Sequence, residues 1–359
     1  MSVTFEYGFS KVRDLQAIGE RDRRTGKVQI SSIVVDGRTA IPTRRFWKSF
    51  FVRFGIADNV FRYFEPTEVF RRISERCPED QLRFCVERDE EDGKSRLLAV
   101  SHPDRGVVRY GEILDIASRH GGNAPQYAEG IVTTTHVPGS GEYSFQIGGD
   151  EFQRQFVMET PVDGFSHPKI YLSLLRQVCS NGMVGYTRAF RSDVSLGRDI
   201  AHCIRRALET YDNGEGYAAL RQRFESAQTS WASVRECMQV YKCLTKSLDR
   251  GEFNSTTVLR DFYQMTGNLN ELYGLANLNA LSNKRQRILP ARCRIYDLLN
   301  FVSELGTHHA TAAGSRSMQA CVGNLICDEY DLEGTADSVG DFQDFLVSKD
   351  RGESDVLRN

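Results

Sequence analysis

LRFCVERDEEDGKSRLLAVS, residues 82–101, contains the pattern that decides the fold class. Two strand-like runs, residues 82–88 and 95–101, flank the turn sequence DEEDGK. A tight hairpin needs a residue that adopts positive φ, and Asp92-Gly93 supplies one in the turn. These residues therefore predict an antiparallel hairpin.

Further strand-like runs extend to about residue 190. Residues 129–137, rich in β-branched side chains, and residues 142–148 lie on either side of PGSG, which predicts a second hairpin. A third strand is expected to follow and to contain Phe152. Between the hairpins, residues 110–122 predict a helix that ends at Gly121, because glycine tolerates the left-handed conformation of a helix C-terminus.

The pattern becomes helical in the second half of the chain. Residues 217–250 contain no Gly or Pro, and apolar residues recur at alternating steps of four and three, as in a heptad repeat. This spacing predicts one helix of about 50 Å at 1.5 Å per residue. Two interpretations stay open, because the helix can pack in its own bundle or form a coiled coil in a homo-oligomer.

Shorter helical patterns follow near residues 253–265, 269–282, 292–306 and 310–327. We therefore predict an α+β protein whose β-rich N-terminal half, with antiparallel hairpins, precedes an α-helical C-terminal half with one long heptad-patterned helix. The predicted domains are 1–190, β-rich with a basic N-terminal region, and 191–327, a helical bundle. Residues 328–359 are expected to form an acidic, largely mobile tail.

Composition narrows the functional classes. With 359 residues, 40% hydrophobic and 26% charged, the chain can bury a sizeable core. We expect a cytoplasmic protein without a membrane partner, because no run approaches the roughly 20 apolar residues of a membrane helix and no signal peptide begins the chain. The nine cysteines form no CxxC pair, so we expect them to be reduced and mostly buried.

Charge is distributed unevenly along the chain. Residues 11–62 contain twelve Lys or Arg and five acids, a net charge of 12 − 5 = +7. Residues 327–359 contain ten acids and three bases, a net charge of 3 − 10 = −7, and residues 279–296 contain five bases and no acid. Such an acidic tail can occupy a basic groove of its own chain or contact a partner.

The segment LLRQVCSNGMVGY, residues 174–186, follows TPVDGFSHPKIYLS, residues 160–173. Together with YDLLNFVSELGTHH, residues 296–309, it resembles the phage/plasmid-like family known as domain of unknown function 932. The resemblance covers most of residues 40–310 and rests on the Cys-Ser-Asn-Gly segment. It implies a gene carried by a mobile element, and it implies no known reaction.

Candidate catalytic groups are sparse. Cys179 could act as a nucleophile with His136 or His167 as its base, although Asn181-Gly182 is also an ordinary turn. Asp150 and Glu151 could supply carboxylates for a metal-dependent nuclease. The glycines form no GxxxxGK[ST] or GxGxxG pattern, so we expect no cofactor, and we expect no metal site.

The most suggestive segment is PTRRFWKSFFVRFG, residues 42–55. Its cations could track phosphates while an aromatic face stacks on unpaired bases. The spacing of Phe46, Phe50 and Phe54 also predicts an amphipathic core-facing helix, and we favour this interpretation for the phenylalanines. The candidate nucleic-acid-binding residues are Arg44, Arg45, Lys48 and Arg53 for phosphates, Trp47 for stacking, and Lys284, Arg285 and Arg287 as a secondary patch.

The first hypothesis is a non-catalytic nucleic-acid-binding protein of a phage or other mobile element. It would bind single-stranded DNA in recombination, replication or evasion of host defence. Two rivals stay open: a metal-dependent nuclease built around Asp150 and Glu151, and a structural protein that oligomerises through residues 217–250. The sequence pI of 6.4 counts against the first hypothesis, so only local patches can support it.

Overall fold

The computed structural model describes residues 3–327 except 22–27, 139–143, 148, 177–180, 185–190, 195–198, 212, 256 and 275–276. The chain forms two compact units, each of which gathers segments that are distant in sequence. Unit 1 comprises Met1–Thr134, Met158–Lys169 and Asp193–Thr210, and unit 2 comprises Thr135–Val157, Ile170–Ser192 and Tyr211–Asn359. The domain boundaries expected near residues 190 and 327 stay predictions, and the expected acidic tail lies outside the described residues.

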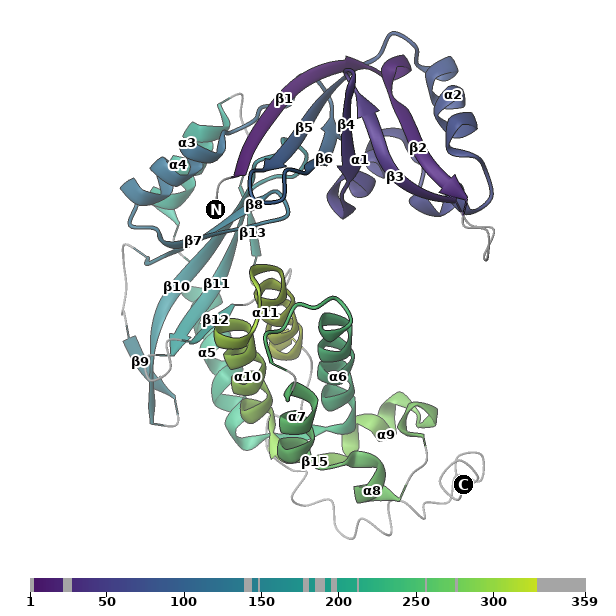
Figure 1. Ribbon diagram of the computed structural model, residues 1–359. Coiled ribbons are helices and arrows are strands. Elements are labelled where there is room, and N and C mark those ends of the chain that lie inside the picture. The colour runs from purple at the N-terminus through teal and green to yellow at the C-terminus, as the bar shows by residue number, and fades with distance from the viewer. Residues whose placement is uncertain are drawn as a thin grey trace. The chain divides into compact units, whose positions relative to one another are not determined.

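A six-stranded sheet forms the frame of unit 1 (Figure 1). Its order is β1-β5-β6-β4-β3-β2, and the described pairs are antiparallel except β4 with β6. The predicted hairpin of residues 82–101 is confirmed as β5 and β6, with Gly93 at a φ of 65° in its turn. The strands are β1 (Val3–Lys11), β2 (Gln16–Arg21), β3 (Val28–Val35), β4 (Arg38–Pro42), β5 (Gln81–Asp89) and β6 (Ser95–Ser101).

Helix α1 (Arg44–Phe54) covers part of this sheet, and α2 (Pro66–Arg76) lies close to β2. The Thr43 side chain accepts a hydrogen bond from the Phe46 amide at the start of α1, and Gly55 ends the helix at a φ of 71°. Phe46 and Phe50 are fully buried in the core of unit 1. The expected amphipathic helix is therefore confirmed.

The second sheet has the order β12-β11-β10-β8-β7, with β13 paired to β11 and β9 paired to β10. The hairpin expected between residues 129–137 and 142–148 is wrong, because β9 pairs with β10 around Gly149. A Gly-Gly pair between two strands is a recognised hairpin signal. The strands are β7 (Asn123–Ala128), β8 (Ile131–His136), β9 (Ser144–Ile147), β10 (Asp150–Pro161), β11 (Lys169–Arg176), β12 (Asn181–Val184) and β13 (Arg191–Asp193).

Unit 1 also contains α3 (Tyr110–Arg119) and α4 (Ile200–Thr210), which lie side by side (Figure 1). The helix expected at residues 110–122 is confirmed as α3, and Gly121 follows it at a φ of 68°. In the described part of the chain, no helix combines the length and the apolar character that crossing a bilayer requires.

The single long helix expected at residues 217–250 is wrong. The structure has α5 (Gly214–Thr229), a short strand β14 (Trp231–Ser233) and α6 (Val234–Leu248). Strand β14 pairs with β15 (Pro290–Arg294), and the Arg294 guanidinium lies 3.8 Å from the Trp231 ring centroid. The Ser233 amide donates to Glu236 Oε2 at 2.7 Å, which is half of a capping box and starts a new helix.

The break also turns the buried face of α6 away from the apolar positions of the expected heptad repeat. Cys237, Val240 and Leu244 are buried, whereas Met238 and Tyr241, which continue the heptad repeat, are only half-buried. In α5, Leu220 and Phe224, two of the apolar residues of the expected heptad repeat, are buried in the core of their own unit. These residues therefore do not form a continuous coiled-coil surface for a second copy.

The remaining helices of unit 2 complete its core. Phe152 of β10 contacts Phe224 of α5, with 6.1 Å between ring centroids, so strands and helices share this core. The broad prediction of antiparallel sheets followed by a helical region is confirmed. The other helices are α7 (Val258–Thr266), α8 (Leu269–Tyr273), α9 (Asn283–Ile288), α10 (Ile295–Glu304) and α11 (Ala312–Cys327).

Candidate functional site

The four cations of α1 have different environments. Arg44 and Lys48 are exposed, one turn apart on the outer face of the helix. Arg45 Nε instead lies 2.5 Å from Asp163 Oδ2, and the side chains are 11% and 0% exposed. Arg53 pairs with Asp80 at 2.8 Å. Among these cations, only the outer pair, Arg44 and Lys48, has no ion pair with a described residue.

Trp47 packs within an aromatic cluster. Its ring lies in edge contact with Phe46, at 4.9 Å between centroids, and Phe50, at 5.6 Å. The Phe61 ring is 5.3 Å away. The Trp47 side chain is half-buried and packs against the core of unit 1. Phe51, which is 52% exposed, shares the outer face of α1 with Arg44 and Lys48.

The expected secondary patch lies on α9 in unit 2. Arg285 is buried, and Arg287 is exposed but already has an interaction partner. Lys284 belongs to the same helix, and its side chain lies outside the described part. These residues share one short helix, but Arg285 and Arg287 do not form a common exposed cationic face.

A cavity of about 260 Å³ opens on unit 1 at residues that the sequence interpretation missed. This unit 1 cavity is lined by Tyr7, Gly8, Phe9, Arg83, Val107 and Arg109. Arg83 Cζ lies 5.0 Å from the centroid of the Phe9 ring, and Phe9 is 52% exposed. Arg109 is exposed and precedes the first turn of α3. The cavity thus combines two guanidinium groups with an accessible aromatic ring.

Strand alternation explains this arrangement. Phe9 pairs with Arg83 and Tyr7 pairs with Cys85 across β1 and β5, so all four lie on the same face of the sheet. Leu82 and Phe84, on the opposite face, pack in the core with Phe46 and Phe50. A side chain at Gly8 would collide with the Phe84 ring, so glycine lets the two strands meet there. In the sequence, the alternation of Phe5, Tyr7 and Phe9 was the pattern that could have indicated an aromatic face on this strand.

A buried polar network lies behind the cavity. The Tyr7 hydroxyl donates to the Val162 carbonyl at 2.9 Å, and the Phe165 amide donates to Asp163 Oδ1 at 2.9 Å. Burial raises the pKa of the Tyr7 phenol far above its usual value, and burial followed by the Asp163 charge raises the pKa of Cys85. Cys85 is therefore a protonated thiol at neutral pH, without the properties of an activated nucleophile.

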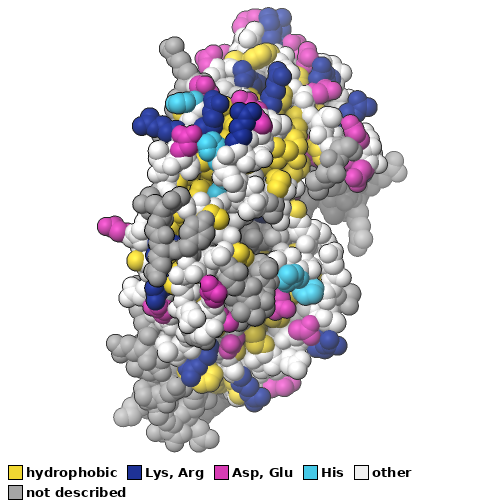
Figure 2. Space-filling model, turned by 90° about the vertical axis from the view of Figure 1, so that its left-hand side faces the viewer, with side chains coloured by type: hydrophobic (Ala, Val, Ile, Leu, Met, Phe, Trp, Pro, Cys, Tyr) yellow, Lys and Arg dark blue, Asp and Glu magenta, His cyan; other side chains and the backbone are white. Residues whose placement is uncertain are grey.

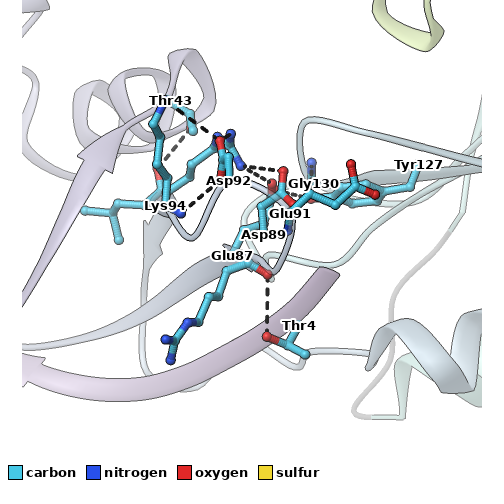
Figure 3. Close-up of polar contacts among 12 residues, drawn as sticks. Thr4, Thr43, Glu87, Asp89, Glu91, Asp92, Lys94, Tyr127 and Gly130 are labelled. Carbon is cyan, nitrogen blue, oxygen red and sulfur yellow. Dashed lines mark hydrogen bonds and ion pairs between the residues drawn. The ribbon is translucent and has the colours of Figure 1, made fainter. Parts of the chain in front are cut away.

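A second part of this network surrounds Glu87 on β5 (Figure 3). The Tyr127 hydroxyl donates to Glu87 Oε2 and accepts from the Gly130 amide at 2.9 Å. Burial, followed by the Glu87 charge, raises the pKa of the Tyr127 phenol. Arg96 Nη1 lies 3.4 Å from Glu87 and 3.2 Å from Asp89. Every one of these charges has a partner, which indicates a structural role.

The carboxylates proposed for a nuclease do not converge. Asp150 and Glu151 are successive residues of β10, so their side chains point to opposite faces of the strand. The Tyr296 hydroxyl donates to Asp150 Oδ2 at 2.8 Å, whereas Glu151 is exposed. Among the residues that the structure describes, no group of three or more His, Cys, Asp or Glu could hold a metal ion. Cys179 lies outside the described residues.

No protein-family model, curated protein or solved structure matches this chain. The resemblance of residues 174–186 to the phage/plasmid-like family therefore stays a prediction.

Proposed function

We propose that this chain is a non-catalytic protein of a phage or other mobile element that binds single-stranded nucleic acid through unit 1. Its process would be recombination, replication or evasion of host defence. The observation that carries the proposal is the half-exposed Phe9 ring beneath Arg83, with Arg109 in the same cavity. Guanidinium groups bind phosphates, and an exposed aromatic face stacks on an unpaired base.

The volume of the unit 1 cavity suits one nucleotide of a single strand. This volume of about 260 Å³ lies just below the range of about 300–1,000 Å³ that is usual for drug-sized ligands. A duplex would hide its base faces in stacks, so stacking on Phe9 favours unpaired nucleotides.

The outer face of α1 offers a second contact. Arg44 and Lys48 stand beside the half-exposed Phe51, which repeats the combination of cations and an aromatic ring. On the face of unit 1 that Figure 2 shows, Lys and Arg side chains lie among acidic and hydrophobic ones. Since the formal net charge of the whole chain is −2, binding would depend on such patches and would weaken steeply with salt.

The test is fluorescence anisotropy with a labelled single-stranded oligonucleotide across a salt series. Phe9→Ala should weaken binding by about 1–3 kcal/mol, the usual value of one base stack. Phe9→Leu is the matched control, because it keeps apolar bulk but has no aromatic face, and it should bind as weakly as Phe9→Ala. Arg83→Ala should flatten the salt dependence by about 0.7 in log–log slope, and Arg83→Lys should restore it.

Two results would oppose the proposal. The first is the absence of binding at low salt, and the second is unchanged affinity in both Phe9 variants. Cleavage of the oligonucleotide on addition of Mg²⁺, lost in Asp150→Asn, would instead support the rival nuclease hypothesis.

A further inference from the structure

Unit 2 contains a separate cavity of about 290 Å³ between α6, α7 and the segment that follows α7. We call it the unit 2 cavity. Its described lining has no charged side chain. The lining residues are Cys237, Met238, Tyr241, Phe262, Tyr263, Thr266, Gly267, Asn268, Leu269, Asn270, Asn277, Leu278 and Asn279.

One wall of this cavity is aromatic. The centroids of the Tyr241 and Tyr263 rings are 5.9 Å apart, and Phe262 lies 5.8 Å from Tyr263. Phe262 is buried and holds the group in the core, whereas Tyr263 is 42% exposed. An aromatic ring that is anchored on one side and open on the other can stack on a flat ligand.

The rim consists of asparagines from a short sequence that occurs twice. Asn-Leu-Asn stands at residues 268–270 and again at 277–279. In both copies the leucine, Leu269 or Leu278, is 8% exposed and packs in the core. The flanking asparagines are exposed and line the cavity. Each leucine therefore anchors a pair of amide side chains at the rim.

The backbone brings the two copies together. Gly267 has a φ of 75°, which favours glycine, and it lets the chain turn between α7 and α8. Asn277 Oδ1 accepts a hydrogen bond from the Asn279 amide at 3.0 Å, which orients one side chain. The side chains of Asn268, Asn270 and Asn279 make no hydrogen bond with a described residue, so their amides can meet a ligand.

We propose that the unit 2 cavity binds the uncharged base of a nucleoside, with the base against Tyr263 and its edge toward the asparagine amides. An asparagine amide offers one donor group and one acceptor, which matches the adjacent donor and acceptor atoms of a base edge. The uncharged lining disfavours a phosphate, which binds most tightly where Lys or Arg side chains are present.

This inference does not depend on the proposed binding of a strand by unit 1. The unit 2 cavity lies in the other unit and recognises a neutral ring, so its binding should be insensitive to salt. A strand bound through phosphates would show a steep salt dependence. Salt-insensitive nucleoside binding that Tyr263→Ala weakens and Phe9→Ala leaves unchanged therefore reports on this cavity, and the two proposals can fail separately.

The experiment is saturation-transfer NMR and calorimetry on the full chain with adenosine, guanosine, cytidine and uridine at millimolar concentration. Binding of at least one nucleoside, unchanged between low and high salt, is expected. Tyr263→Ala should weaken it about tenfold, within the range for one base stack. Asn268→Ala with Asn270→Ala should weaken it by a similar factor, whereas Asn59→Ala, an exposed asparagine of unit 1, should have no effect.

Thermal unfolding of each variant verifies that it folds, and Tyr263→Phe keeps the ring and should bind like the parent. The proposal is overturned if no nucleoside binds, if the asparagine and tyrosine variants bind like the parent, or if glucose or mannose binds in place of the nucleosides.

Discussion

Arg45 Nε lies 2.5 Å from Asp163 Oδ2, although the two residues are 118 positions apart. Asp163 is fully buried, and its other oxygen accepts the Phe165 amide. The pair therefore neutralises a charge inside unit 1. Arg45, which the sequence suggested for phosphate binding, is engaged within the fold.

The first prediction concerns stability. Arg45→Ala should lower the free energy of unfolding by about 3–5 kcal/mol, because it leaves the Asp163 carboxylate buried without its partner. Urea denaturation measures the difference. Arg44→Ala, which removes an exposed neighbour, should change stability by less than about 0.5 kcal/mol. Equal stability of the two variants would contradict the assigned role of the pair.

The second prediction separates phosphate binding from folding. Arg44→Ala with Lys48→Ala should reduce the salt slope of oligonucleotide binding by about 1.4, or 0.7 for each lost contact, and should leave the urea midpoint unchanged. Arg45 must be left intact, since its loss would confuse the two effects. Anisotropy titrations at several salt concentrations give the slope, and an unchanged slope would exclude the outer face of α1 from the interface.

The third prediction is a loss of stability at alkaline pH. Tyr7 and Tyr127 have phenol pKa values raised by burial, so the folded protein keeps their protons above pH 10, where the unfolded chain releases them. Stability should therefore be intact below about pH 10 and fall as the pH rises further. Urea midpoints between pH 7 and 11 measure the slope. Tyr127→Phe should be less stable at neutral pH but should show a shallower decline, and an unchanged decline would contradict the assignment.

The fourth prediction concerns cysteine reactivity in unit 2. A hydrogen bond from Cys321 lowers the pKa of the half-buried Cys243, whereas the pKa of Cys237, hydrogen-bonded with Cys293 and buried, is raised. Cys243 should therefore be alkylated by iodoacetamide before Cys237, because the thiolate is the reactive form. Mass spectrometry of timed samples gives the order. Cys321→Ala should slow the modification of Cys243, and faster modification would oppose this account.

The fifth prediction tests the start of α6. Glu236→Ala should lower the free energy of unfolding by about 1–2 kcal/mol, because the buried Ser233 amide loses its acceptor. Thermal or urea unfolding provides the measurement. Arg235→Ala, at the neighbouring half-buried position, serves as the comparison and should cost less. An equal loss of unfolding free energy in both variants would argue that the capping contact does not contribute to stability.

Some features were visible in sequence because their signals are local. The hairpin of β5 and β6 follows from the Asp92-Gly93 turn between two strand-like runs. Helix α1 follows from the spacing of Phe46, Phe50 and Phe54. A capping residue or a turn glycine acts on atoms a few positions away, so its effect can be recognised without the fold.

The interruption at residues 231–233 shows where a local pattern failed. The heptad spacing continues through Trp231, so helical periodicity alone favoured one helix. The sequence also contains Ser233 and Glu236, which form the capping box of a new helix. The β14 backbone instead pairs with β15 near residue 290. That partner lies some 60 positions along the chain, and no helical periodicity within residues 217–250 contains information about it.

The sequence by itself determined that strand-like segments precede helical ones, where several of them end, and that the chain has basic and aromatic residues near its start. Only the tertiary structure decided which of those residues are accessible. It placed Arg45 on Asp163, packed Trp47 against Phe61, and left Phe9 exposed beneath Arg83. Local conformation depends on neighbours in the chain, whereas burial and charge pairing depend on contacts between residues far apart in sequence.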